Sequence, residues 1–295
     1  MGTCLFCQSE GPYTREEHII PEALGNDDLL LVGEVCDKCN QYFGTEVERF
    51  VLAKTPLAFW RVFLGIRTKH GKLPHVELSQ PKRQRGRLPR VHRLHDDLVG
   101  FTCHEDYTVS VDIEDPQIVR EIIEGTRTRL TSVLTPLVLS MLGRFLCKVG
   151  VELLCSTDGR RARSAAFDAA RRFARFGQGA SLWPIFHGTC GSLHALKRRF
   201  QVGDEIHEEV LCYSYRILKA GPYDLLALTV GTDSWVVGLN DAYPTPAIRE
   251  CLQDSTPLEL LWYPEEEVAR SHDVAANDQP EMKPAPNRPT DRSTN

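Results

Sequence analysis

The sequence predicts a mixed α+β protein, in which a small metal-stabilised N-terminal module precedes a larger α+β domain. Three observations support this fold class. Two CxxC pairs occur near the N-terminus, apolar residues recur at helical spacing through the middle of the chain, and strand-like runs follow from about residue 181. The chain has 295 residues, 42% of them hydrophobic, which is enough to bury a sizeable core.

The expected domain boundaries follow changes in composition. Residues 1–52 are dense in Cys, Gly and turn residues and form the first module. Residues 53–262 are expected to form the mixed α+β domain. Residues 263–295 are polar and rich in Pro, Asn and Asp, so we expect a disordered tail there.

The first module should end in a helix. In the stretch NQYFGTEVERFVLAK, residues 40–54, the apolar side chains Phe43, Val47, Phe50 and Val51 fall on one helical face. After Pro56, the apolar stretch PLAFWRVFLGI is expected to be helical or buried. Residues 70–93 are rich in Pro, Gly and Arg and predict an exposed loop or hairpin.

Several helices are expected in the middle of the chain. YTVSVDI alternates as a strand does, and a helix should begin next, with Asp115 as its N-cap and Pro116 in its first turn. The most apolar helical segment spans residues 129–154, where Pro136 starts or kinks the helix. Residues 164–179 predict an amphipathic helix that Gly177 ends.

Strands are expected to dominate the remainder. The runs SLWPIFHG, EEVLCYSYRIL, DLLALTVG and SWVVGLN each read as a strand. Turns are expected at Lys219–Gly221 and at Gly231–Asp233, between these runs.

The cysteines fall into two groups. Two CxxC pairs, with residues 8–35 between them, place four thiolates at the spacing of paired zinc knuckles, and they predict a closed structural Zn²⁺ site. Its ligands are Cys4, Cys7, Cys36 and Cys39. A redox dithiol is the alternative, but it would need a βαβ context. We expect the other six cysteines to be buried small apolar residues: Cys103, Cys147, Cys155, Cys190, Cys212 and Cys251.

Charge is segregated along the chain. The formal net charge is -5, but residues 1–50 carry ten acidic against three basic side chains, whereas residues 54–93 carry eleven basic against one acidic. Residues 120–200 are also basic. A polyanion is therefore an expected partner for the chain outside its acidic first module.

The stretch TREEHIIPEALGN, which lies between the two CxxC pairs, places Glu17 and His18 before a short apolar run. Asn40 directly follows the second pair and opens the expected helix. In these features the first fifty residues or so resemble the HNH endonuclease family, of ββα-metal fold, in its four-cysteine form. The resemblance implies that Glu17 and His18 correspond to the family's acid–histidine pair and Asn40 to its closing position.

The chemistry that the resemblance implies suits these residue types. Neutral His18 can take a proton from the attacking water as general base. Glu17 and Asn40 offer the hard oxygen ligands that Mg²⁺ or Mn²⁺ prefers, and such a metal stabilises the leaving 3′-oxygen of a phosphodiester. The expected activity is hydrolysis of DNA, and restriction or phage defence would fit it.

One departure from the family concerns its middle Asn, about nine residues before the last motif position. Leu31 stands there, and Asn26, Asp27 or Asp28 are the candidates to replace it. The alternative to an enzyme is a non-catalytic zinc-ribbon module that binds nucleic acid.

We expect DNA to be held outside the acidic first module, by phosphate contacts from a basic loop. Its residues are Lys82, Arg83, Arg85, Arg87, Arg90 and Arg93. A second group of arginines is expected to form solvent-exposed helix surface: Arg160, Arg161, Arg163, Arg171, Arg172 and Arg175. No segment approaches the ~18 apolar residues that span a membrane, and no secretory signal opens the chain, so a cytoplasmic protein is expected.

Overall fold

The computed structural model describes most of the first 262 residues. The described ranges are 2–68, 70–77, 100–105, 109–113, 115–127, 134–179, 183–189, 197–202, 205–210, 213–240 and 259–262. They all belong to one compact unit, Met1–Trp262, and residues 263–295, where a tail is expected, lie outside them. Helices and strands are both present, so the predicted mixed α+β class is confirmed.

The helices lie in the first two thirds of the chain. They are η1 (Glu22–Leu24), α1 (Asp37–Tyr42), the π-helical η2 (Phe43–Glu48), α2 (Arg49–Lys54), α3 (Pro56–Phe63), α4 (Pro116–Ile123), α5 (Pro136–Thr157), α6 (Gly159–Ala162), η3 (Ala165–Phe167) and α7 (Asp168–Phe176). The expected helix over residues 40–54 is therefore confirmed as three consecutive segments, with a π-helical turn in its middle.

The strands form antiparallel sheets. They are β1 (Glu17–His18), β2 (Leu30–Leu31), β3 (His75–Glu77), β4 (Gly100–Cys103), β5 (Val109–Asp112), β6 (Ile185–Thr189), β7 (Lys197–Val202), β8 (Glu205–Val210), β9 (Tyr213–Ala220), β10 (Tyr223–Val230), β11 (Asp233–Gly238) and β12 (Glu259–Trp262). The largest sheet has the order β12-β6-β11-β10-β9, and the others are β3-β4-β5, β1-β2 and β7-β8.

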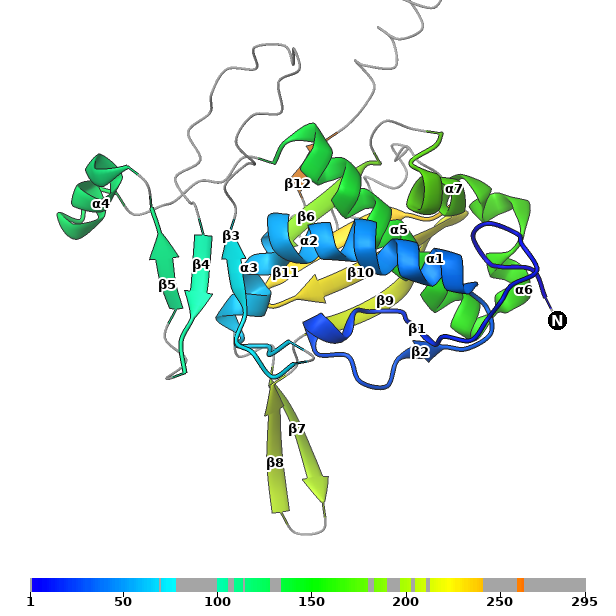
Figure 1. Ribbon diagram of the computed structural model, residues 1–295, viewed down its shortest axis with the longest axis horizontal. Coiled ribbons are helices and arrows are strands. Elements are labelled where there is room, and N and C mark those ends of the chain that lie inside the picture. The colour runs from blue at the N-terminus through cyan, green and yellow to red at the C-terminus, as the bar shows by residue number, and fades with distance from the viewer. Residues whose placement is uncertain are drawn as a thin grey trace, which may run out of the picture. The chain divides into compact units, whose positions relative to one another are not determined.

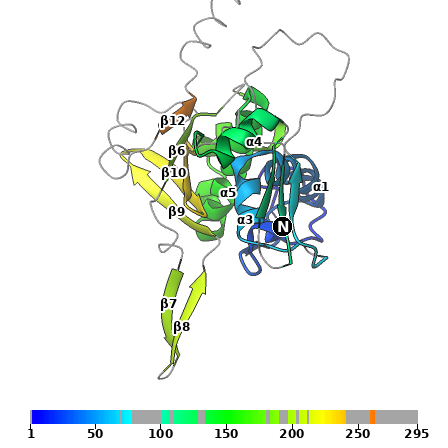
Figure 2. The ribbon, with the colours of Figure 1, turned by 90° about the vertical axis from the view of Figure 1, so that its left-hand side faces the viewer.

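The central helix α5 lies between the N-terminal helices and the five-stranded sheet. It contacts η2 and α2 on one side and β9, β10 and β11 on the other (Figure 1). The turned view in Figure 2 shows these layers edge on, with α5 between the sheet and α3. At Gly150 an added Cβ would lie 2.5 Å from a terminal methyl of Leu239, so a larger residue there would require that side chain to shift.

Local sequence signals explain where the helices begin and end. Thr135 accepts a hydrogen bond from the Val138 amide and caps α5, with Pro136 in the first turn. Asp115 caps α4 in the same way, through the amide of Gln117. Gly177 has φ 64° and ends α7. The three predicted signals at Pro136, Asp115 and Gly177 are thus confirmed.

The strand predictions are confirmed for β5, β6, β10 and β11, and the two expected turns join β9 to β10 and β10 to β11. The single strand expected over residues 208–218 was wrong, because this stretch contains the end of β8 and most of β9. The hairpin β7–β8 was not predicted. Lys197–Arg199 and Glu205–Glu209 place so many charges in it that no apolar strand pattern shows in the sequence.

One hydrophobic core joins the N-terminal module to the rest of the unit. It includes Phe43 and Val47 from η2, Phe145 from α5 and Trp235 from β11, all at most 1% exposed. The core continues across the boundary expected after residue 52, and that boundary stays a prediction. Two of the six scattered cysteines, Cys147 and Cys155, are buried as expected.

Candidate metal centre and active site

The four N-terminal cysteines converge on one point. The sulfurs of Cys4, Cys7, Cys36 and Cys39 all lie within 4.8 Å of one another, and those of Cys7 and Cys36 are 3.5 Å apart. Tetrahedral zinc with Zn–S bonds of about 2.3 Å would place its sulfurs roughly 3.8 Å apart. The cluster could therefore hold a metal ion, and the convergence of the two CxxC pairs is confirmed.

The electrostatics of the thiols also suit a cation. A hydrogen bond from the thiol of Cys39 lowers the pKa of Cys4 to about 4. The same bond, together with burial, raises the pKa of Cys39. One thiolate is thus favoured at neutral pH, and a bound cation would favour ionisation of its neighbours.

An arginine from the larger domain contacts the cysteine cluster. Nε of Arg175 in α7 donates to Sγ of Cys39 at 3.2 Å, and its guanidinium lies 3.8 Å from the centre of the Tyr42 ring. Arg144 of α5 donates to the hydroxyl of the same tyrosine. Arg175 therefore places positive charge beside the thiolates, and the two arginines together join α5 and α7 to Tyr42 of α1.

The expectation that the second group of arginines forms a solvent-exposed surface was wrong for most of its members. Arg161 pairs with Asp224 at 2.5 Å, Arg163 pairs with Glu34, and the buried Arg171 pairs with Asp168. Only Arg160 and Arg172 of this group are exposed. The charges that looked free in the sequence are used to join segments of the fold.

Strand β1 carries the acid–histidine pair. Glu17 pairs with Leu31 of β2, and His18 pairs with Leu30. Glu17 is buried, with 4% of its surface exposed, while His18 is half-buried. Both side chains keep an unused polar atom, because Oε2 of Glu17 and Nδ1 of His18 are buried and have no hydrogen-bond partner among the described residues.

The buried ammonium of Lys148 in α5 holds this strand. Its Nζ donates to the backbone carbonyl oxygens of His18 at 2.6 Å and Ile19 at 3.3 Å. It also lies 2.7 Å from Oε1 of Glu17. A side chain of α5 thus fixes the backbone and the carboxylate at the acid–histidine pair.

Two further carboxylates surround the same ammonium. Oε1 of Glu48 lies 2.8 Å from Nζ of Lys148, and Oε2 of Glu152 lies 3.1 Å from it. Burial raises the pKa of Glu17 to about 7 even though Lys148 opposes it, and burial also raises the pKa of Glu152. One lysine cannot neutralise three carboxylates, so the cluster retains a proton at neutral pH.

The first turn of α1 holds the segment that leads into β1. Nδ2 of Asn40 donates to the backbone carbonyl oxygen of Glu16 at 2.9 Å. Asp37 accepts from the backbone amides of Thr14 at 2.8 Å and Arg15 at 3.1 Å. The structure therefore brings Asn40 to the strand that carries Glu17 and His18.

Asn26, one of the candidates to replace the family's middle Asn, has a well-defined place in the fold. It is fully buried, and its amide donates to the carbonyl oxygens of Ile20 and Leu29. Its oxygen accepts from the amide of Leu29 and from the hydroxyl of Tyr213. Asn26 thus closes the turn between β1 and β2, and its described bonds do not reach His18.

Sequence reasoning missed Lys148, Glu48 and Glu152. The signal for two of them was present, because a Lys and a Glu four residues apart interrupt the most apolar helix of the chain. The predicted nucleic-acid-binding residues Lys82, Arg83, Arg85, Arg87, Arg90 and Arg93 lie outside the described residues.

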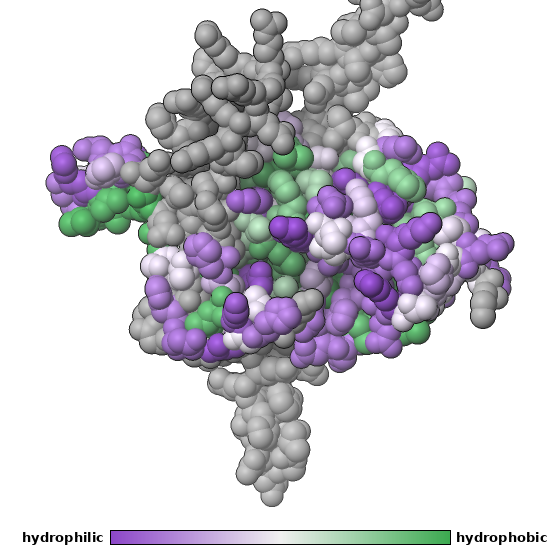
Figure 3. Space-filling view, in the orientation of Figure 1, coloured by the Kyte–Doolittle hydropathy of each residue, from purple (hydrophilic) through white to green (hydrophobic). Residues whose placement is uncertain are grey.

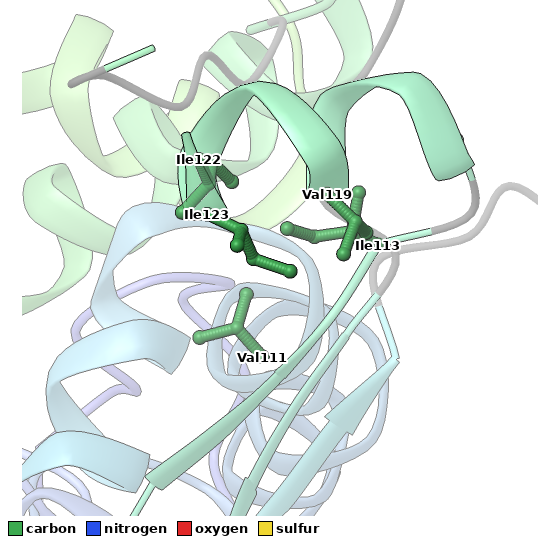
Figure 4. A pocket seen from close by; sticks show the side chains of 5 residues that line it. All are labelled: Val111, Ile113, Val119, Ile122 and Ile123. Atoms are coloured by element: carbon green, nitrogen blue, oxygen red, sulfur yellow. The ribbon is translucent and has the colours of Figure 1, made fainter. Parts of the chain in front are cut away.

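A separate apolar recess of about 370 Å³ lies between β5 and α4 (Figure 4), lined by Val111, Ile113, Val119, Ile122 and Ile123. Apolar side chains of α4, such as Ile123, remain exposed beside it and form a green patch in Figure 3. The recess has no titratable lining residue and offers no acid–base chemistry. Among the described residues, no helix combines the length and apolar character needed to cross a membrane.

Comparison with known proteins agrees with the geometry. A family model described as HNH endonuclease matches residues 4–55. This segment begins with the first of the four clustered cysteines and includes β1, β2 and α1. No curated protein and no solved structure matches the chain.

Proposed function

We propose that residues 4–55 form a metal-dependent HNH endonuclease module, of ββα-metal type, that hydrolyses phosphodiester bonds of DNA. The observation that carries the proposal is the family match over a segment in which Asn40 contacts the strand bearing Glu17 and His18. Restriction and phage defence are roles that such an activity would serve.

The metals are assigned by the chemistry of the donors. Four thiolates suit a structural Zn²⁺ that joins the two CxxC pairs and takes no part in the reaction. The unpartnered carboxylate oxygen of Glu17 and the amide oxygen of Asn40 suit a hard cation, Mg²⁺ or Mn²⁺. When bound, such a cation stabilises charge on the phosphate and on the leaving 3′-oxygen.

Proton transfer and positioning are assigned to side chains of the protein. His18 accepts the proton of the attacking water, and its buried Nδ1 is available for a bond that orients the ring. Asn40 ties α1 to the entrance of β1 and keeps the two elements in place. The basic segment from Lys82 to Arg93, which lies outside the described residues, is assigned the contacts to the DNA backbone.

A plasmid-nicking assay tests this function. Wild-type protein should nick DNA when Mg²⁺ is added to metal-free buffer, and a chelator is avoided because it would also strip zinc. His18→Ala should lose cleavage by roughly two to four orders of magnitude, the usual contribution of a general base, while keeping zinc and DNA binding. His75→Ala is the matched control, because His75 is an exposed histidine in β3.

The outcomes separate the two readings of the module. If His18→Ala nicks DNA at the wild-type rate, the active site lies elsewhere. If wild-type protein binds DNA without nicking it under any divalent metal, residues 4–55 act as a non-catalytic zinc-ribbon binding module.

A further inference from the structure

The catalytic carboxylate is held from outside its own module. Glu17 offers two oxygens, and the structure distinguishes them, because Oε1 lies 2.7 Å from Nζ of Lys148 while Oε2 is buried without a partner. Lys148 is itself fully buried, and its position on α5 is fixed by the packing of that helix between two layers. The ammonium therefore selects which oxygen of Glu17 is left for another ligand.

The same ammonium also sets the backbone of β1. Its bonds to the carbonyl oxygens of His18 and Ile19 fix the peptide plane that follows the acid–histidine pair. Strand β1 pairs with β2 over only two residues, so its own ladder gives little rigidity. The contacts from α5 thus supply positional restraint that the strand lacks.

We propose that Lys148 is a positioning residue of the nuclease site, which binds Oε1 of Glu17 and the β1 carbonyls so that Oε2 is presented to the divalent cation. The inference rests on the proposed function and extends it to a residue outside the family match. Partners that orient metal ligands in this way typically contribute 10–100-fold to metal affinity.

Glu48 and Glu152 also lie within ion-pair distance of the lysine, but they approach it from different elements. Glu48 belongs to η2, within the matched module, and approaches the ammonium from the helix side. Glu152 lies one turn along α5, on the same helix as Lys148, and forms its ion pair there. Glu152→Gln therefore changes the surroundings of the ammonium and leaves its bonds to β1 in place, which makes it a matched control.

The first test measures Mn²⁺ binding to the full-length, zinc-loaded protein, by the electron paramagnetic resonance signal of free Mn²⁺. Lys148→Met combined with Glu152→Gln removes the ammonium without leaving its neighbour on α5 charged. We expect the Mn²⁺ dissociation constant to rise about 10–100-fold, with Glu152→Gln alone within about twofold of wild type. The Mn²⁺ concentration for half-maximal nicking should rise in parallel.

A second test leaves Lys148 in place. It is used if the double variant loses zinc or does not unfold cooperatively. In Glu17→Gln the lysine, which has only donors, must take the amide oxygen, so the amide nitrogen occupies the place of Oε2. Glu17→Gln should then bind Mn²⁺ no better than Glu17→Ala. If the lysine did not select one oxygen, the amide oxygen could turn to the cation. The Mn²⁺ affinity of Glu17→Gln would then lie between those of wild type and Glu17→Ala.

Two results would contradict the role of Lys148 without contradicting the proposed nuclease function. Unchanged Mn²⁺ affinity in the folded Lys148→Met/Glu152→Gln variant, or intermediate affinity in Glu17→Gln, would show that Lys148 does not orient the carboxylate, although the nuclease could still act. Failure of wild-type protein to bind Mn²⁺ or nick DNA would instead remove the proposed function itself.

Discussion

The ammonium of Lys148 lies 2.7 Å from the carboxylate of Glu17, although the lysine is in the central helix α5 and the glutamate is in the first strand. The proposed nuclease module is thereby joined to α5 at its own acid–histidine pair. A buried glutamate that shares one lysine with two other carboxylates should make the stability of the protein depend on pH.

The first prediction concerns that dependence. Because the pKa of Glu17 is raised in the fold from 4.5 to about 7, its contribution to stability is complete below pH 4.5 and is lost as pH rises through 7. Glu17→Gln should therefore gain stability relative to wild type between pH 4.5 and pH 8, by about 2 kcal/mol up to pH 6 and by about 1 kcal/mol more from pH 6 to pH 8. The full difference is about 3 kcal/mol, and thermal unfolding in magnesium-free buffer measures it.

Zinc cancels from this comparison, because both proteins carry the same four thiolates over the same pH range. A difference in melting temperature that is constant from pH 6 to pH 8 would mean that Glu17 keeps the same ionisation in both states.

The second prediction concerns the cysteine cluster. Purified protein should contain one Zn²⁺ per chain, and Cys36→Ser with Cys39→Ser should lose it and lower the melting temperature, since the free energy of metal binding contributes to folding. Metal analysis and thermal unfolding measure the two effects. Cys147→Ala is the control, a buried cysteine of α5 that should keep zinc. Zinc retained by the double serine variant would contradict the assignment.

The third prediction separates the two side chains that we propose bind the catalytic metal, Glu17 and Asn40. Asn40→Ala removes a neutral ligand and one hydrogen bond to Glu16, so it should lower the free energy of unfolding by about 1 kcal/mol. Its cleavage defect should be milder than that of Glu17→Ala, and both should recover in part at high Mg²⁺ or with Mn²⁺. Nicking rates across a metal titration test this. A larger defect for Asn40→Ala would reverse the assigned roles.

The fourth prediction concerns the basic loop. Reversing charge at Arg83, Arg85 and Arg87 to Glu should weaken DNA binding equally for all sequences. The slope of the logarithm of the binding constant against the logarithm of salt concentration should also become less steep, by about 0.9 for each phosphate that the loop no longer neutralises. A filter-binding titration measures both, with the exposed pair Arg160 and Arg172 reversed as a control for net charge. Unchanged affinity and slope would exclude this loop as the phosphate-binding segment.

The sequence by itself determined the parts of this protein that depend on short-range chemistry. The spacing of the CxxC pairs predicted that four sulfurs would converge, because two knuckles of that spacing suit one tetrahedral ion. Caps such as Asp115 and Thr135 and turn glycines such as Gly177 set the helix ends through local hydrogen bonds and backbone angles. The roles expected of the acid–histidine pair and of Asn40 came instead from the resemblance of this segment to the HNH endonuclease family.

Only the tertiary structure decided where the charges go. Lys148 and Glu152 stand four residues apart in an apolar helix, but the sequence did not show that Glu17 and Glu48 join them, and Arg161, Arg163 and Arg175 looked like solvated surface. These further partners lie far away along the chain, and ion pairing depends on distances in space that a one-dimensional pattern does not contain. Packing of α5 against β1 and η2 therefore fixed how Glu17 is held, and with it the geometry of the candidate site.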